Sequence, residues 1–206
     1  AMQWMAGDVS ATTGIKGAGD FLSKTIRGKV TGESVIKPEY TGDGTLVLEP
    51  TYKHIILLDL DEWGNSIVLD DGLFLACEST LKQKAVRRKT FSSAFAGGEG
   101  FFNLGLKGSG VVCIESDCSR EELVEITLED DVVKIDGNLA IAWSGSLDFT
   151  VERAGKSLLG SAASGEGLVN VYRGTGKVLL APVGNQAMKP QQVIEKEPVI
   201  VGDDDE

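Results

Sequence analysis

The sequence predicts an all-β protein built from three related units, and two observations carry that prediction. A Gly-x-Gly motif followed by an apolar run occurs three times, beginning at Gly42, Gly108 and Gly174, which are spaced 66 residues apart. Apolar and polar residues alternate in many short runs, and no segment sustains a helical period. A fixed period of this length is typical of repeat architectures. We therefore expect three pseudo-symmetric repeats closing into a β-prism or double-stranded β-helix-like ring, which disposes of exposed sheet edges.

Each complete unit is expected to contain six short strands, and the second unit is the template. Its Gly-Ser-Gly motif at Gly108 is expected to close one hairpin, because glycine relieves the positive φ that a tight turn requires. The pair Asp130 and Asp131 is expected to close a second hairpin. The first unit repeats this order in register, since Leu69 matches Ile135 at the same spacing.

The third unit contains only the first half of the template. The missing half is predicted at the other end of the chain, where Ala6 to Val9 resembles Ser144 to Leu147. We therefore expect the N-terminal strands to complete the third unit and close the ring. The predicted units are residues 32–97, 98–164, and 165–184 completed by 1–31, all in one domain of residues 1–184, followed by an extended acidic tail at 185–206.

Composition excludes several classes of protein. The 206 residues carry a net charge of −11, which disfavours nucleic acid as a partner because it repels phosphates. Cys77, Cys113 and Cys118 form no C-x-x-C pair, which fits neither a disulfide framework nor a zinc site and favours a reducing compartment. There is no apolar run of about 18 residues and no signal segment, so we expect a protein that is soluble or lies on a membrane surface.

Four segments carry a more specific pattern than alternation alone: AMQWMAGDV, GESVIKPEYTGDGTLVLEP, AFAGGEGFFNLGLKGSG and KSLLGSAASGEGLVNVYRGTGKVLLAPV. They resemble the altered-inheritance-of-mitochondria family and its bacterial relatives of unknown function. The resemblance extends to about Val183. It implies an all-β fold grouped with double-stranded β-helix and tryptophan-attenuator-like proteins, without an established enzymatic activity. Mitochondrial members are linked by name to mitochondrial biogenesis; for this chain we expect a bacterial cytoplasmic location, or a mitochondrial one if the source is eukaryotic.

Residues capable of nucleophilic catalysis are few. His54 is the single histidine, and a polar strand end is the favoured interpretation. Cys113 takes the place of Val47 and Leu179 in the other units, so we expect a buried, inert thiol. Cys118 falls in a turn and is expected to be more exposed. No catalytic residue is predicted, and the chain is expected not to be an enzyme.

Two further patterns suggest ligand sites only weakly. The carboxylates of LDLDEWG and LEDDVV could coordinate Ca²⁺, but their spacing is not that of an EF-hand loop, and turn chemistry is favoured. The Gly-x-Gly motifs lack the helix N-terminus and lysine of a phosphate loop, so they are assigned to backbone geometry. We therefore expect no metal and no cofactor.

Candidate interaction surfaces lie in the segments that precede each Gly-Glu pair. These segments mix bulky apolar residues with Gly and Ser, and ring symmetry would gather them at one end, either as an exposed rim or as plugs of the barrel. The apolar candidates are Phe21, Leu22, Phe91, Phe95, Leu158 and Leu159. A basic run is a candidate contact for anionic lipid, with a charged strand edge as the favoured interpretation. Its candidate residues are Lys82, Lys84, Arg87 and Arg88.

The three tryptophans are candidate walls of a small-ligand pocket. Trp143 and Met5 fall at matching positions of two units, which favours core packing for both. Trp63 falls in a turn and is the one expected to form an exposed contact. Trp4 lies on the N-terminal strand.

The strands TLVLEP, VVCIES and KVLLAPV are apolar on both faces, which predicts that both faces are covered. One cover is the core; the other is a neighbouring sheet or another subunit. The sequence therefore predicts a non-enzymatic β-repeat scaffold or interaction protein that self-assembles as a homo-oligomer, with an unidentified protein partner. The alternatives are a small-ligand-binding module at the ring end and a protein that docks on a membrane surface.

Overall fold

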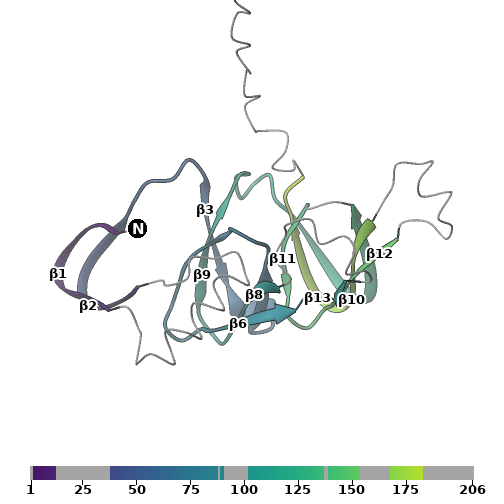
Figure 1. Ribbon diagram of the computed structural model, residues 1–206, viewed down its shortest axis with the longest axis horizontal. Coiled ribbons are helices and arrows are strands. Elements are labelled where there is room, and N and C mark those ends of the chain that lie inside the picture. Colours follow the sequence, from purple (N-terminus) through teal and green to yellow (C-terminus); the bar gives the residue numbers. More distant parts are fainter. Residues whose placement is uncertain are drawn as a thin grey trace, which may run out of the picture.

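The molecule is all-β, as the sequence predicts, in the computed structural model of Figure 1. The structure describes residues 2–12, 38–87, 89–90, 102–136, 139–153 and 168–182. Within these ranges the single helical segment is the 3-10 turn η1 (Leu60–Trp63), and none of them contains a helix able to span a membrane. The six apolar candidates from Phe21 to Leu159, residue Arg88 and the acidic tail lie outside the described residues.

In the described part of the chain, thirteen strands form three sheets, none of which closes into a barrel. The smallest is a two-stranded ribbon of β1 (Met2–Thr12) and β2 (Glu39–Leu48). The next has the order β3 (His54–Asp59), β9 (Val111–Ser116), β5 (Phe74–Cys77). The largest has the order β6 (Lys82–Arg87), β8 (Phe102–Lys107), β4 (Ser66–Leu69), β11 (Ala140–Ser144), β13 (Leu168–Leu180), β12 (Asp148–Arg153), β7 (Lys89–Thr90), with β10 (Val124–Asp136) also paired to β13.

Buried apolar side chains form two clusters, and strands β4, β11 and β13 contribute to both. The larger cluster joins these strands to the three-stranded sheet and receives Leu69 and Leu179. The smaller cluster receives Val68 and Val178, their neighbours along the two strands. Successive residues of a strand point to opposite faces, so the two clusters lie on opposite faces of this part of the sheet. The cover predicted for both faces of KVLLAPV is thus found at Val178 and Leu179, each 0% exposed.

Strand pairing recurs with the spacing of 66 seen in the sequence. Ala76 of β5 pairs with Cys113 of β9, and 66 residues later Ala142 of β11 pairs with Leu179 of β13. Each ladder contains an irregularity immediately before this pair. The ribbon has the same register and the same irregularity, with Trp4 opposite Val47. The ribbon's strands pair only with each other in the described part of the chain, so the expected closed ring is not formed there.

The Gly-x-Gly motifs do not close hairpins, which corrects the expectation from the sequence. Gly42 and Gly174 lie inside the continuous strands β2 and β13 with φ of 123° and 114°. At Gly108, with φ of 137°, the chain passes from β8 in the largest sheet to β9 in the three-stranded sheet. The glycines therefore let one extended segment bend and change partners, a use of positive φ that the sequence does not distinguish from a turn.

The acidic pair after Leu128 also forms no hairpin. β10 runs continuously through Asp130 and Asp131, with a bulge between Leu128 and Asp131 and a φ of 53° at Asp130. The N–H of Asp130 donates to the Thr175 hydroxyl, 3.0 Å away, so the bulge is held by the strand opposite. Bulges of this kind bend a strand without ending it.

Candidate functional site

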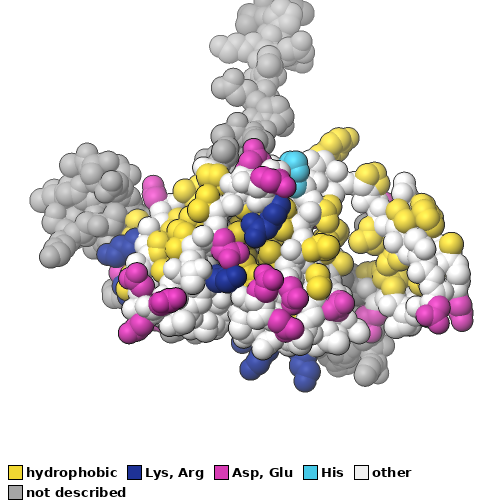
Figure 2. Space-filling model, turned by 180° about the vertical axis from the view of Figure 1, so that it is seen from behind, with side chains coloured by type: hydrophobic (Ala, Val, Ile, Leu, Met, Phe, Trp, Pro, Cys, Tyr) yellow, Lys and Arg dark blue, Asp and Glu magenta, His cyan; other side chains and the backbone are white. Residues whose placement is uncertain are grey.

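The β1–β2 ribbon exposes apolar side chains whose counterparts elsewhere in the chain are buried. Trp4 is 49% exposed and Met5 40%, whereas Ala142 and Trp143, at the equivalent places on β11, are 0% and 4% exposed. Figure 2, seen from behind, shows hydrophobic side chains gathered on the ribbon at the right of the molecule. The core packing expected from the match of Met5 with Trp143 is therefore found for Trp143 and not for Met5.

The second strand of the ribbon repeats this contrast. Leu46 and Val47 of β2 are half-buried, whereas Val178 and Leu179, the equivalent residues of β13, are fully buried. β13 has strands on both of its edges, but β2 has β1 on one edge and no partner on the other among the described residues. Exposed apolar side chains and unpaired strand edges are features that often mark contacts with other protein segments.

Close backbone packing explains why the ribbon forms at this place. Gly7 and Gly42 adopt φ of 91° and 123°, and a Cβ on Gly42 would collide with the carbonyl oxygen of Asp8. The hydroxyls of Ser10 and Thr41 lie 3.2 Å apart across the two strands and form a hydrogen bond. The glycines and this hydrogen bond therefore fix the register of β1 on β2, and with it the positions of the ribbon's apolar residues.

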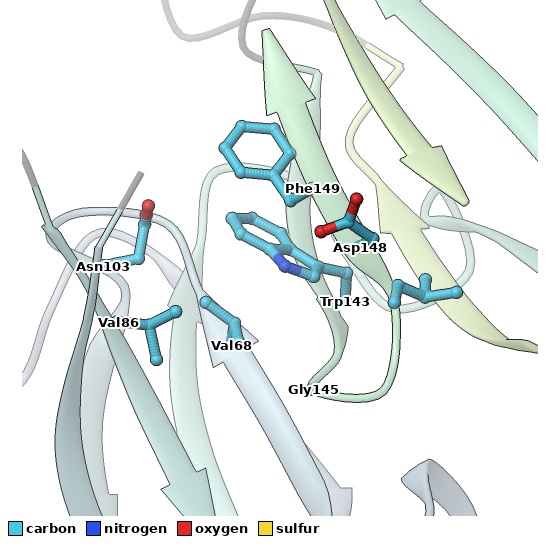
Figure 3. Close-up of a pocket in the computed structure, with 8 residues that line it drawn as sticks. Val68, Val86, Asn103, Trp143, Gly145, Asp148 and Phe149 are labelled. Carbon is cyan, nitrogen blue, oxygen red and sulfur yellow. The ribbon is translucent and has the colours of Figure 1, made fainter. Parts of the chain in front are cut away.

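A shallow hollow of about 190 Å³ lies where the smaller cluster meets the surface (Figure 3). Its wall includes Trp143 and Phe149, whose ring centroids are 5.1 Å apart, and Tyr172 packs against both rings. On the opposite side lies Asn103, whose amide donates to the carbonyl of Leu69 at 3.1 Å. Trp143 therefore lines a pocket, as the alternative ligand-binding hypothesis expects of one tryptophan. The lining residues are Val68, Val86, Asn103, Trp143, Gly145, Leu147, Asp148 and Phe149.

Trp63 is a core residue and not the exposed contact that its place in a turn suggested. It ends η1, is 3% exposed and belongs to the larger cluster. The ammonium of Lys177 lies 5.8 Å from its ring centroid and 2.9 Å from a carboxylate oxygen of Glu125. The 3-10 turn folds the indole inward under this ion pair, which a periodicity argument along the sequence does not reveal.

His54 lies exposed at the start of β3. Ser116 faces it across the ladder but is buried, and its hydroxyl accepts the N–H of Cys118 at 3.1 Å. A nearby carboxylate, Glu122, accepts the backbone N–H of Ser119 at 2.8 Å. That hydrogen bond lowers the pKa of Glu122, with a smaller contribution from His54. These contacts are those of turns, and they present no activated nucleophile to the histidine.

The cysteines differ from one another in their surroundings. Cys113 is partly exposed, and burial, with a smaller effect of Glu115, raises the pKa of its thiol. A raised pKa disfavours the reactive thiolate. Cys118 is 3% exposed and lies in the larger cluster, which corrects the expected exposure. The turn after Ser116 folds toward the core and carries the thiol with it.

The carboxylates of LDLDEWG make turn contacts. Asp59 caps η1 by accepting the N–H of Asp61 at 3.0 Å, and the hydroxyl of Ser109 donates to Asp61 at 3.0 Å. No cluster of His, Cys, Asp and Glu with metal-binding geometry occurs among the described residues. The favoured interpretation as turn chemistry is confirmed for Asp59.

Lys82 and Lys84 are exposed on β6, which lies at one end of the strand order of the largest sheet. Arg87 ends this strand. Contact of this basic run with anionic lipid stays a prediction.

Sequence reasoning missed the exposure of the ribbon and most of the hollow. The signal available for the ribbon was the incomplete unit to which it belongs. Among the described residues β2 pairs with β1 alone, whereas β9, its equivalent in the second unit, lies between β3 and β5. For the hollow, the signal was Asn103, a polar residue between the apolar Phe102 and Leu104; it is buried and also donates to Asp70 at 3.2 Å.

Comparison with known proteins identifies the family. The sequence profile described as mitochondrial biogenesis AIM24 matches residues 1–183. This chain belongs to that family. The resemblance noted in the sequence is thereby confirmed.

An uncharacterized protein of Streptococcus pyogenes serotype M6 is 30% identical over 187 residues, which cover 87% of this chain and 73% of that protein. A Streptococcus pyogenes protein solved by X-ray crystallography is 30% identical with a TM-score of 0.63, and the match covers 90% of this chain and 82% of the other. Membership of the AIM24 family therefore supports the fold and names no reaction.

Proposed function

We propose that this chain is a non-enzymatic β scaffold that works by self-association through the β1–β2 ribbon. The observation that carries the proposal is the exposure of Trp4 and Met5 at positions whose equivalents in β11 are buried. Burying apolar surface is the main driving force of protein association. Aromatic residues and methionine are also enriched at interfaces.

The character of the polar sites supports the same proposal. His54 is exposed and faces a buried serine, and the pKa of the Cys113 thiol is raised. Catalysis needs an acid, base or nucleophile held in mutual reach. Among the described residues, the exposed apolar ribbon is therefore a better candidate for function than any of these polar groups.

Light scattering after size exclusion, over a dilution series, tests the proposal. We expect a concentration-dependent oligomer, and we expect Trp4→Asp to shift it to the monomer by placing a charge in the apolar contact. Tyr52→Asp is the matched control, because Tyr52 is a fully exposed aromatic residue outside the ribbon. A monomer at every concentration would contradict the proposal, and so would an oligomer indifferent to the Trp4 change.

A second candidate function is the binding of a small ligand in the hollow beside Trp143. The hollow's volume of about 190 Å³ is below the roughly 300–1,000 Å³ usual for ligand pockets, so the candidate ligand has few heavy atoms. Thermal stabilisation by a small-molecule library, lost in Trp143→Leu but kept in Trp4→Asp, would favour this function over self-association.

A further inference from the structure

The contact between β4 and β11 is the link that joins the two halves of the largest sheet. The strands run antiparallel, with Val68 opposite Trp143. Two backbone hydrogen bonds flank the pairs. The N–H of Asp70 donates to Ile141 at 2.9 Å, and the N–H of Gly145 donates to Ser66 at 2.8 Å.

The ribbon strand β1 is the counterpart of β11. On β13, Trp143 of β11 pairs with Val178. On β2, Met5 of β1 pairs with Leu46, the residue that corresponds to Val178. β1 therefore carries the register that lets β11 pair with β4, but its second edge has no strand beside it among the described residues.

The second half of β10 is the counterpart of β4. Ser66 of β4 pairs with Lys107 of β8, and 66 residues later Val132 of β10 pairs with Arg173 of β13. β4 has strands on both edges, whereas β10 is paired along one edge only in the described ranges. Val132 is 47% exposed beside this open edge.

We propose that β1 of one copy pairs antiparallel with residues 132–136 of β10 in a second copy, with Met5 opposite Lys134. The inference rests on the proposed self-association and names its partner surface. Carrying over the register of β11 and β4 also places Trp4 opposite Ile135. Directly opposite side chains lie about 5 Å apart, so the pairing covers Trp4 and Met5, which are 49% and 40% exposed in a single copy.

The flanking hydrogen bonds carry over as well. The N–H of Gly7 donates to the carbonyl of Val132, as that of Gly145 does to Ser66 within the chain. Val133 is half-buried in one copy, whereas Ile67, its counterpart in β4, is fully buried beneath neighbouring strands. Pairing with β1 of a second copy would bury Val133 in the same way. Each open edge thus receives the partner that its counterpart has inside one chain.

The position of the ribbon favours a second copy over the same one. Figure 1 shows β1 and β2 at one end of the molecule and β10 near the other, with the sheets between them. The ribbon is joined to β3 by residues 49–53, which extend to at most about 18 Å. The proposed contact joins β1 of one copy to β10 of another, so its two sides are different surfaces. Every β1 finds a β10 if two copies exchange their ribbons or if several copies form a closed ring.

Disulfide trapping between two differently labelled chains tests the pairing. One chain carries Met5→Cys and the other Lys134→Cys, both at exposed positions, and far-UV circular dichroism checks that each keeps its fold. Directly opposed residues of an antiparallel pair have Cα separations that suit a disulfide. We expect a mixed dimer of twice 21.8 kDa under mild oxidation, with the two engineered cysteines joined in peptide mass spectra. The matched control replaces Lys134→Cys by Glu129→Cys, an exposed position on the same strand, and gives no such dimer.

Each other outcome overturns the inference. A single chain that carries both Met5→Cys and Lys134→Cys is the further test. If it forms the disulfide within one monomer, and the separate chains form no mixed dimer, β1 lies against its own β10. Oligomers in light scattering without the Met5 to Lys134 link refute this pairing while the proposed self-association stands. A monomer at every concentration refutes both.

Discussion

Replacing Leu179 by alanine tests whether β13 is the wall shared by the two hydrophobic clusters. Leu179 is 0% exposed and belongs to the larger cluster, while its neighbour Val178 belongs to the smaller one. Truncation of a fully buried leucine costs about 2–5 kcal/mol, the larger values applying where neighbours cannot collapse into the cavity. Strands hold the site from both sides, so we expect a loss of about 3–4 kcal/mol in the free energy of unfolding. Urea denaturation followed by tryptophan fluorescence at low protein concentration measures it.

Val47→Ala is the matched control, because Val47 takes the place of Leu179 in the ribbon and is only half-buried. Removing two methyl groups from a half-buried site costs about 1 kcal/mol or less. The ribbon argument depends on Leu179 and Val47 holding equivalent positions, of which only the first is fully buried. Equal losses in the two variants, or a loss below about 1 kcal/mol for Leu179→Ala, would refute it.

Three further predictions follow from the described contacts. Trp63→Ala is expected to lower the free energy of unfolding by about 3–5 kcal/mol and to leave the oligomer's mass unchanged, because the indole is buried. If this variant were instead a folded monomer, Trp63 would be a contact residue after all. The pKa of Glu152 is lowered by hydrogen bonds from Arg173 and Thr150, so its carboxylate stabilises the fold above the ordinary pKa of glutamate and loses this effect as pH falls through the lowered value. Glu152→Gln should therefore lower the urea midpoint at pH about 7, and the deficit should shrink steadily as the pH falls below about 4; a deficit that is the same in acid as at neutral pH would contradict this cause. In alkylation with a thiol reagent, Cys118 should react only on unfolding, at the rate at which the fold opens; labelling of Cys118 in the native protein ahead of Cys113 would contradict its burial.

The spacing of 66 residues predicted strand positions well because it reports backbone register. Ala142 and Ala76 match in the sequence, and both pair in the same register with equivalent strands. The all-β class followed from alternation of apolar residues, which is a local property of each strand. The family resemblance added the same class from independent motifs.

The sequence could not predict which side of a turn faces the core. Trp63 and Cys118 were expected at the surface because they lie in turns, yet η1 and the Ser116 hydrogen bond fold both side chains inward. The Gly-x-Gly motif was ambiguous for a related reason. A positive φ serves a hairpin or a bend inside one strand equally well, and the choice depends on partners far away in the chain.

The expected ring also depended on partners that a period cannot supply. Met5 matches Trp143 in the sequence, but the strand that would cover Met5 is absent from the described neighbourhood of the ribbon. A repeat predicts equivalent positions, whereas burial depends on which neighbour is present.

Strands β4, β11 and β13 have a consequence for how the molecule comes apart. Each contributes side chains to both clusters, so we expect that neither cluster unfolds while the other stays intact. Hydrogen exchange should therefore reveal one cooperative body of slowly exchanging amides centred on these three strands, with the β1–β2 ribbon exchanging first. We therefore expect that no cut between the repeats yields a fragment that folds alone, so that the chain is periodic in its sequence but unfolds as one unit.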